Sequence, residues 1–284
     1  MATPALTLLL DHLTLQKLNH NCYASRGNNG SLGRLYGGEI LAQSLSAADN
    51  TIERPFIAHS LHAHFLHLGS ADSPLEYQIE RLRDGRSFAT RRVNAVQAGR
   101  MIFTATVSYH IPQPGFEHQD TVDINAYPKP ESLVSEAERY RAFLPESMHN
   151  LYGWPIDFRQ TQAVDLLNPA VAERQHAVWI KSQAELPDDQ NLHRQLLTYC
   201  SDNPLLLTAL RPHGKTNWSD GMQVASLDHA IWFHAEFRLD EWLLFTLDSP
   251  RASASRGLAT GHIYNQQGCL VASVIQEGVM RKKP

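Results

Sequence analysis

Apolar residues recur every three to four positions in one stretch near the start of the chain, and they alternate with polar residues in the stretches that follow. Four residues have the spacing of one helix face: Ile40, Leu41, Leu45 and Ala48. Alanine is abundant there, so we expect a helix that opens after Tyr36-Gly37-Gly38-Glu39. Period-two alternation then predicts strands over residues 59–66, 75–84, 87–97 and 100–110.

The same order of signals returns in the second half of the chain. An apolar run over residues 203–210 follows Tyr199-Cys200-Ser201-Asp202. Asp202 and Pro204 have the positions that helix N-termini prefer, so we expect a second helix that begins at Asn203. Strands are expected over residues 223–234, 242–249, 257–264 and 269–279.

This repetition indicates an internal duplication of one α+β unit. Tyr36 matches Tyr199 at an offset of 163 residues, and Phe65 matches Phe233 at an offset of 168. A strongly apolar helix must bury its surface, and an antiparallel sheet that follows the helix can wrap around it on one face. We therefore expect an α+β fold in which two such units pair their sheets.

A segment rich in proline and poor in alternation separates the two units and is interpreted as a linker. Inside it, Ser135 and Glu138 have the spacing of a capping box, which predicts a short helix that runs to Leu144 and stops at Pro145. The expected domains are a first unit over residues 1–112, the linker over 113–160 and a second unit over 161–284.

Composition narrows the function classes. The 284 residues are 43% hydrophobic and 19% charged, with a formal net charge of −4 and no basic stripe, which disfavours a nucleic-acid partner. The apolar run Leu6–Leu10 is too short for a membrane helix and lacks a charged segment before it. Cys22, Cys200 and Cys269 form no disulfide framework. These features predict a cytoplasmic protein with no membrane partner.

Two candidate chemistries have weak support. Cys200 beside Asp202 at a helix start could be a nucleophile, although a small buried residue is the simpler interpretation. Four histidines crowd nine residues: His59, His62, His64 and His67. On a strand only His62 and His64 would share a face, so we expect ordinary sheet histidines and no metal site.

A hydrolytic site without a metal is more coherent. Asp202 could be a simple N-cap carboxylate, and Ser226 a half-buried hydroxyl on the face of Val224, Asp228 and Trp232. Gln276 shares a strand face with apolar residues, where an amide needs hydrogen-bonding partners. It is either satisfied within the core or directed to a polar site, and the pattern leaves both possibilities open.

Four ordered motifs resemble the acyl-CoA thioesterase II family. They are Arg83–Phe88 (RDGRSF), Gly115–Gln119 (GFEHQ), Ser226–His234 (SLDHAIWFH) and Val271–Gly278 (VASVIQEG). The resemblance covers nearly the whole chain and implies a double hot-dog fold, in which each of two long helices is wrapped by an antiparallel sheet. It also implies hydrolysis of fatty acyl-CoA to fatty acid and CoA, with acyl-CoA as the binding partner.

The family uses an Asp, a Ser or Thr, and a Gln to hold and activate one water. Position by position, the resemblance places these roles on Asp202, Ser226 and Gln276. Asp202 would be the general base, and the other two would orient the water. We expect no cofactor or metal, and the resemblance suggests that the chain forms a homo-oligomer, a tetramer or a dimer.

Two details of the site stay open in the sequence. The N–H groups that meet the oxyanion could come from the Asn203 end of the second helix or from the Gly37-Gly38 end of the first. Glu39 matches Asp202, since each lies three residues after a matched tyrosine. Glu39 could therefore be a second base, or it could line the same pocket or be a helix-start carboxylate.

The repeat partners of the other site residues are less suitable for catalysis. The 168-residue offset pairs Ser108 with Gln276 and Ala58 with Ser226, so we expect one functional site per chain. A hydratase of the same fold would need an Asp with a nearby His on the helix, and no Asp-xxxx-His segment follows Asp202. A non-catalytic acyl-CoA-binding protein is the remaining alternative.

Overall fold

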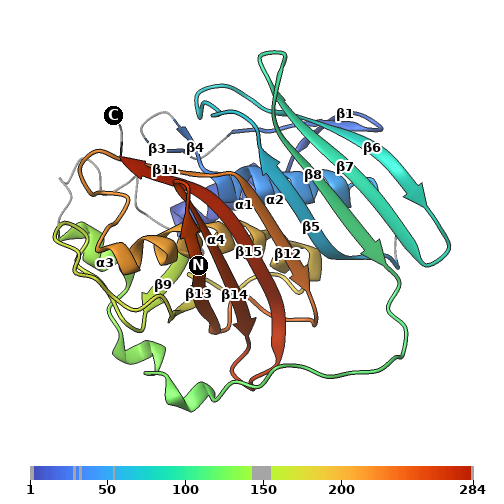
Figure 1. Cartoon of the computed structure of the whole chain (residues 1–284). Coiled ribbons are helices and arrows are strands. Elements are labelled where there is room, and N and C mark those ends of the chain that lie inside the picture. Colours follow the sequence, from blue (N-terminus) through green and yellow to red (C-terminus); the bar gives the residue numbers. More distant parts are fainter. Residues whose placement is uncertain (1–2, 28–29, 32–33, 54, 143–154, 283–284) are drawn as a thin grey trace.

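The computed structural model describes residues 3–27, 30–31, 34–53, 55–142 and 155–282. Within these residues, one antiparallel sheet of 13 strands runs through the molecule (Figure 1). Its earlier strands are β1 (Gln16–Asn19), β2 (Cys22–Ala24), β5 (Ile57–Phe65), β6 (Glu76–Asp84), β7 (Phe88–Gln97) and β8 (Arg100–His110). Its later strands are β9 (Ile156–Gln160), β10 (His176–Ser182), β11 (Met222–Ser226), β12 (Asp228–Phe233), β13 (Leu243–Ser253), β14 (Arg256–Tyr264) and β15 (Leu270–Lys282). A separate pair consists of β3 (Gly30–Ser31) and β4 (Arg34–Leu35).

The centre of the sheet is the pairing of β5 with β12, two strands far apart in sequence. Leu61 lies opposite Ile231, and His62 lies opposite Ala230. Hydrogen-bonded neighbours follow the order β1-β2-β6-β7-β8-β5-β12-β15-β14-β13-β10-β9, and β11 also pairs with β15. The β5–β12 pairing therefore joins the early and the late strands into one continuous sheet.

Two helices pack against one face of this sheet and against each other. They are α2 (Gly37–Asp49) and α4 (Gln190–Leu210), and α1 (Pro4–Leu13) packs on α2. Every residue of α2 from Gly38 to Ala48 is buried. At the far end of α2, Gln195 Nε2 donates to Asp49 Oδ2 at 2.7 Å. The core thus lies between the helix pair and the inner face of the sheet.

Helix α4 begins at Gln190, 13 residues before Asn203. The predicted start at Asn203 is therefore wrong. The N-cap is Asp189, whose side chain accepts from the Asn191 N–H. Pro204 lies inside the helix, although it supplies no N–H and costs about 3 kcal/mol there. Burial of apolar residues on both sides of Pro204, including Leu196 and Leu205, outweighs that local cost.

The strand predicted over residues 223–234 is two strands. Ser226 lies opposite Gly278, whereas Ala230 lies opposite Ile275, so one extra residue is accommodated around Leu227. An extra residue reverses the direction of the side chains that follow it. Ser226 therefore faces inward while Trp232 faces outward, and the prediction that they share a face is wrong.

The linker is more ordered than its composition suggests. Helix α3 (Glu136–Arg141) has the predicted capping box, and short 3-10 turns occur in the linker at Ile124–Ala126 and Pro130–Ser132. Trp179 Nε1 donates to Pro128 O at 2.9 Å, which fastens the linker to the outer face of β10. The linker prediction does not account for β9, which lies within residues 113–160 and pairs with β10. The predicted helix end at Leu144 and the stop at Pro145 lie outside the described residues.

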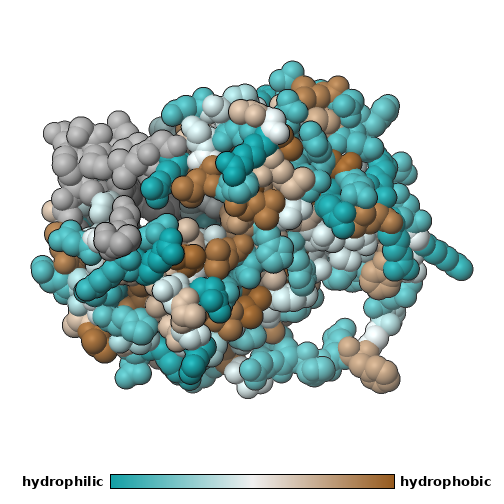
Figure 2. Space-filling view, turned by 45° about the horizontal axis from the view of Figure 1, so that its top comes forward, coloured by the Kyte–Doolittle hydropathy of each residue, from teal (hydrophilic) through white to brown (hydrophobic). Residues whose placement is uncertain are grey.

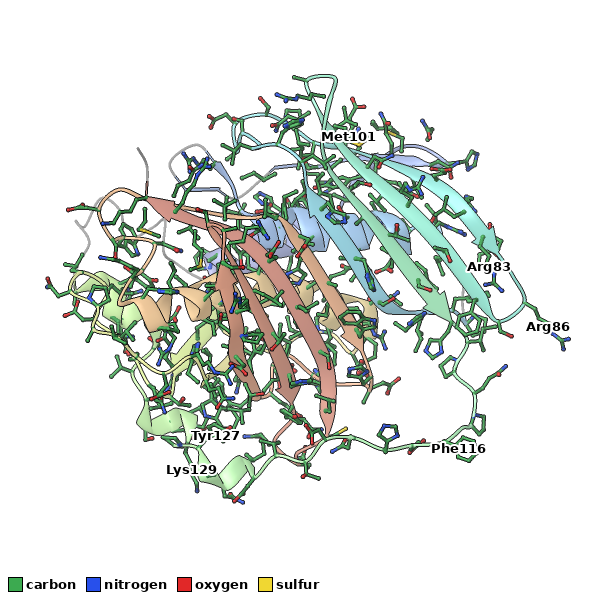
Figure 3. The ribbon with its side chains drawn as sticks, in the orientation of Figure 1. Arg83, Arg86, Met101, Phe116, Tyr127 and Lys129 are labelled. Atoms are coloured by element: carbon green, nitrogen blue, oxygen red, sulfur yellow. The ribbon has the colours of Figure 1, made fainter. Side chains whose placement is uncertain are left out.

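The face of the molecule seen in Figure 2 is mainly hydrophilic, with scattered hydrophobic patches. Arg83 and Arg86 project from the β6–β7 turn, and Phe116 from the segment after β8, at the side of the view remote from α4 (Figure 3). In the described part of the chain, none of the helices combines the length and apolarity needed to cross a bilayer.

Candidate active site

Asp202 is buried in the middle of α4, and two strands bring polar side chains to its carboxylate. Its Oδ1 accepts hydrogen bonds from Ser226 Oγ at 3.2 Å and from Gln276 Nε2 at 3.0 Å. Gln276 Nε2 also donates to Ser226 Oγ at 2.9 Å. The three residues predicted to form the site therefore meet in one cluster.

Gln276 faces the helices from β15, as the alternation predicts. Ala272 and Val274 are buried on the same face, and the Gln276 side chain is itself fully buried. Its amide finds its partners in Asp202 and Ser226, so an otherwise apolar strand face carries a satisfied polar group. Ser226 reaches the cluster because the displacement around Leu227 turns it inward.

The N-terminus of α2 closes on Asp202 from the other side. A Cβ added to Gly37 would lie 2.7 Å from Asp202 Oδ2, and one added to Gly38 would lie 2.0 Å from the carbonyl oxygen of Tyr199. The hydroxyl of Tyr36 donates to that same carbonyl at 3.0 Å. Only glycine permits this approach, which directs the positive end of the α2 dipole at the carboxylate.

Glu39 is also buried in the first turn of α2, and it takes part in a second cluster of polar side chains. Its Oε1 lies 3.0 Å from His12 Nδ1 of α1 and accepts from Gln43 Nε2 at 3.0 Å. Tyr77 donates to Gln43 Oε1 at 2.6 Å. Glu39 is thus a helix-start carboxylate that hydrogen bonds to α1 and to its own helix.

Asn203 follows Asp202 but does not join the cluster. Its side chain lies close to Glu136 of α3, on the linker side of α4. Because Asn203 lies within the helix, its N–H is not at a helix N-terminus, and the prediction of an oxyanion donor there is wrong. The Gly37-Gly38 end of α2 is then the remaining candidate for the oxyanion donors.

Sequence reasoning missed two polar residues that extend the cluster. His229 Nδ1 lies 2.6 Å from Gln276 Oε1, and His229 Nε2 lies 3.0 Å from Ser201 Oγ. Both side chains are buried. The sequence does contain a signal for His229: by period-two alternation it shares a strand face with Ile231 and Phe233, so a polar ring lies on an otherwise apolar face.

The 168-residue offset that pairs Ser108 with Gln276 is wrong by one position. Ser108 points to the outer face of the sheet, where its Oγ lies 2.8 Å from His59 Nε2. In the first half Ala58 lies opposite Tyr109, and in the second half Ser226 lies opposite Gly278. Ala58 therefore does correspond to Ser226, as the offset predicts. The later strand is displaced by one residue, so Val107, fully buried, corresponds to Gln276.

The structure contradicts the nucleophile interpretation of Cys200. The thiol is fully buried inside α4 and donates to Leu197 O at 3.4 Å. Burial raises the pKa of Cys200 far above its usual value, where a helix start would have lowered it.

The histidines of β5 share the outer face of the sheet. A register shift between Ala58 and Ser60 turns His59 to the side of the exposed His62 and His64, so the prediction that His59 points away is wrong. Within the described ranges, no group of three His, Cys, Asp or Glu residues is arranged to hold a metal ion.

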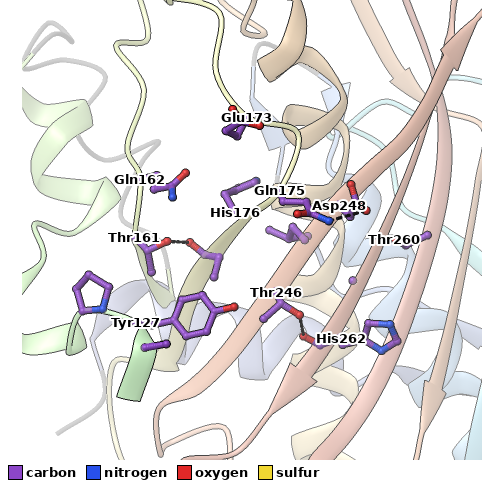
Figure 4. A pocket seen from close by; sticks show the side chains of 15 residues that line it. Tyr127, Thr161, Gln162, Glu173, Gln175, His176, Thr246, Asp248, Thr260 and His262 are labelled. Carbon is purple, nitrogen blue, oxygen red and sulfur yellow. Dashed lines mark hydrogen bonds between the residues drawn. The ribbon is translucent and has the colours of Figure 1, made fainter. Parts of the chain in front are cut away.

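A cavity of about 740 Å³ lies elsewhere, between the linker and strands β10, β13 and β14 (Figure 4). Tyr127, Gln162, Asp248 and His262 are among the residues that line it. None of the predicted site residues lines this cavity, so it is separate from the Asp202 cluster.

Comparisons with known proteins decide the family. A family model described as acyl-CoA thioesterase matches residues 149–279, and one described as acyl-CoA thioesterase N-terminal domain matches residues 26–110. Acyl-CoA thioesterase 2 of Haemophilus influenzae is 36% identical to this chain, over 96% of each sequence. The chain belongs to the acyl-CoA thioesterase family. The predicted resemblance to thioesterase II proteins is thereby confirmed.

One solved structure of a thioesterase II protein agrees with the family, and a more distant structure shares the fold. The crystal structure of acyl-CoA thioesterase II TesB2 from Mycobacterium marinum matches with a TM-score of 0.80 and 39% identity, covering 96% of this chain and 98% of that one. A protein of unknown function with a hot dog fold from Alicyclobacillus acidocaldarius matches with a TM-score of 0.77 and 16% identity, covering 98% and 99%. That second likeness concerns the fold alone, which is a hot-dog fold.

Proposed function

We propose that this thioesterase hydrolyses acyl-CoA at the Asp202 cluster, with Asp202 as the general base. The observation that carries the proposal is the position of Asp202 Oδ1, which accepts from both Ser226 and Gln276. These two bonds fix the plane of the carboxylate and leave Oδ2 directed toward Gly37 at the start of α2. A water held there by Ser226 and Gln276 lies within reach of the base.

The reaction needs no covalent intermediate. Asp202 removes a proton from the water while the water oxygen attacks the thioester carbonyl carbon, and the carbonyl π electrons move to its oxygen. The tetrahedral oxyanion then collapses and breaks the carbon–sulfur bond. The proton on Asp202 passes to the departing CoA thiolate, which yields a free fatty acid and CoA.

The N–H groups of Gly37 and Gly38 are the donors proposed for the oxyanion. The first N–H groups of a helix have no partner within it, and the dipole adds positive potential at that end. Gly37 lies directly beside Asp202, so the same helix end faces both the attacking water and the carbonyl oxygen.

We further propose that the chain is a double hot-dog with one working site. The units would comprise residues 1–112, with α2, and 161–284, with α4, joined by the linker 113–160 and by the pairing of β5 with β12. The first unit has Ala58 and Val107 where the second has Ser226 and Gln276, so it cannot hold the water. A cytoplasmic homo-oligomer, a tetramer or a dimer, completes the proposal.

Release of free thiol from acyl-CoA esters of short to long chain tests the proposal. The Asp202→Asn variant should lose about 10²-fold or more in kcat, the scale of a positioned general base. Asp189→Asn on the same helix is the matched control, because asparagine is an equally good N-cap, and its rate should equal that of the wild type. A wild type that binds acyl-CoA without turnover would instead be a binding protein, and full activity in Asp202→Asn would exclude Asp202 as the base.

A further inference from the structure

Beyond the Asp202 cluster, a buried histidine occupies the space behind Gln276. His229 is 1% exposed on the inner face of β12, and it contacts Gln276 Oε1 on one side and Ser201 Oγ on the other. Burial lowers the pKa of His229, against the opposing effect of Asp202, so the ring is neutral near neutral pH. A neutral imidazole has one donor and one acceptor nitrogen.

The hydrogen-bonding partners fix which nitrogen is the donor. The Gln276 amide must present its NH2 group to Asp202 Oδ1, 3.0 Å from Nε2. The opposite orientation would place the amide oxygen against a carboxylate oxygen. The amide oxygen of Gln276 therefore points at His229, 2.6 Å away, and His229 Nδ1 must donate to it. His229 Nε2 is then the acceptor nitrogen, 3.0 Å from Ser201 Oγ, and the Ser201 hydroxyl lies 3.0 Å from Thr198 O as well.

We propose that His229 is a positioning residue for hydrolysis, holding the Gln276 amide in the one orientation that serves Asp202 and Ser226. The inference rests on the proposed function, because it assigns Gln276 to the water. Without the His229 donor, the amide could rotate and present its oxygen to Asp202, which disrupts the water's hydrogen bonds. His229 acts only through Gln276 and touches neither water nor substrate.

Three substitutions separate this role from simple packing. In His229→Asn, the amide nitrogen is as many bonds from Cα as Nδ1 is, so it can still donate to Gln276. In His229→Gln, the nitrogen corresponds to Nε2, and in His229→Leu no donor remains. We expect kcat to fall by about 10²-fold in His229→Leu, the scale of a misplaced group, with KM changed much less. His229→Gln should lie close to His229→Leu, and His229→Asn should recover most of the rate.

A double-mutant cycle with Gln276→Leu provides the decisive readout. If His229 acts through Gln276, then His229→Leu should cost almost nothing further in the Gln276→Leu background. The matched control is His176→Leu, which removes another buried ring bonded to α4 through Thr208 and should lower thermal stability without lowering kcat. The polar variants carry the test if His229→Leu does not fold.

Each outcome has a distinct meaning. Additive losses in the cycle, or equal rates for His229→Asn and His229→Gln, would overturn the role of His229 while leaving the Asp202 mechanism intact. A Gln276→Leu variant with full activity, or a wild type without turnover, would instead contradict the proposed function itself.

Discussion

Asp202 and Glu39 are buried carboxylates on the two central helices, yet their surroundings differ. Ser226 and Gln276 approach Asp202 from two strands, and Gly37 approaches it from the facing helix. His12 of α1 contacts Glu39, and Gln43 of the same helix donates a hydrogen bond to it. Similar residue types at matching helix positions thus serve different purposes, because the site depends on what converges on the carboxylate.

The sheet beneath each helix shows the same contrast. In the first half, Leu61 pairs with Val107 across β5 and β8, and both side chains are fully buried. In the second half, the contact between β12 and β15 is made by His229 and Gln276. A polar pair in place of an apolar one costs desolvation unless it is fully hydrogen bonded, which is the case here.

The largest expected effect on kcat comes from comparing the two buried glutamines, Gln276 and Gln43. Gln276→Leu should lower kcat by about 10²-fold, because it removes a group that orients the water. Gln43→Leu should instead lower the free energy of unfolding by about 1–3 kcal/mol and leave kcat close to wild type. Among the described residues, Gln43 hydrogen bonds within the Glu39 cluster and to nearby backbone. Thiol release and urea unfolding of both variants measure the contrast, and a large loss of kcat in Gln43→Leu would break it.

Two glycines sharpen the comparison with a smaller effect. In Gly37→Ala the new methyl group would lie 2.7 Å from Asp202 Oδ2, so we expect kcat to fall by about 10-fold as the carboxylate is displaced. In Gly27→Ala the methyl would lie 2.6 Å from His12 Nε2, beside Glu39, and should affect thermal stability only. Equal effects of the two variants on kcat would show that both clusters contribute to turnover.

The smallest expected effect concerns the far end of α2. Burial raises the pKa of Asp49 to about 7, against hydrogen bonds from Gln195 and Tyr109 that favour the charged form. Since this value is above the unfolded one, the stability that Asp49 contributes is fully present below about pH 4 and is lost as the pH rises through 7. Between pH 6 and 8, the free energy of unfolding should fall by about 1 kcal/mol more in the wild type than in Asp49→Asn. Parallel urea curves for the two proteins would contradict the burial of this group.

Sequence patterns predicted much of the fold because alternation is a local signal. The strand predicted over residues 100–110 is β8, and the predicted face of Gln276 is buried as expected. The start of α4 was missed because Asp202 and Pro204 have the local chemistry of a helix N-terminus, and tertiary burial overrides it. Strands β9 and β10 and helix α1 were not predicted.

The residues of the site could be predicted from the sequence, but their arrangement could be predicted only in part. Family resemblance selected Asp202, Ser226 and Gln276, while strand parity placed Ser226 on the wrong face. One residue around Leu227 decides that parity, and bulges leave little trace in composition. The link from His229 to Gln276 crosses 47 positions of sequence and required coordinates to establish.

The most direct test of the central claim compares the two carboxylates in one assay. Single-turnover hydrolysis of one acyl-CoA should be almost abolished in Asp202→Asn and should run at close to the wild-type rate in Glu39→Gln, because the proposed mechanism activates the water at Asp202 alone. If Asp202→Asn and Glu39→Gln each retain about half of the product formed, both halves of the molecule are working sites and the account is wrong.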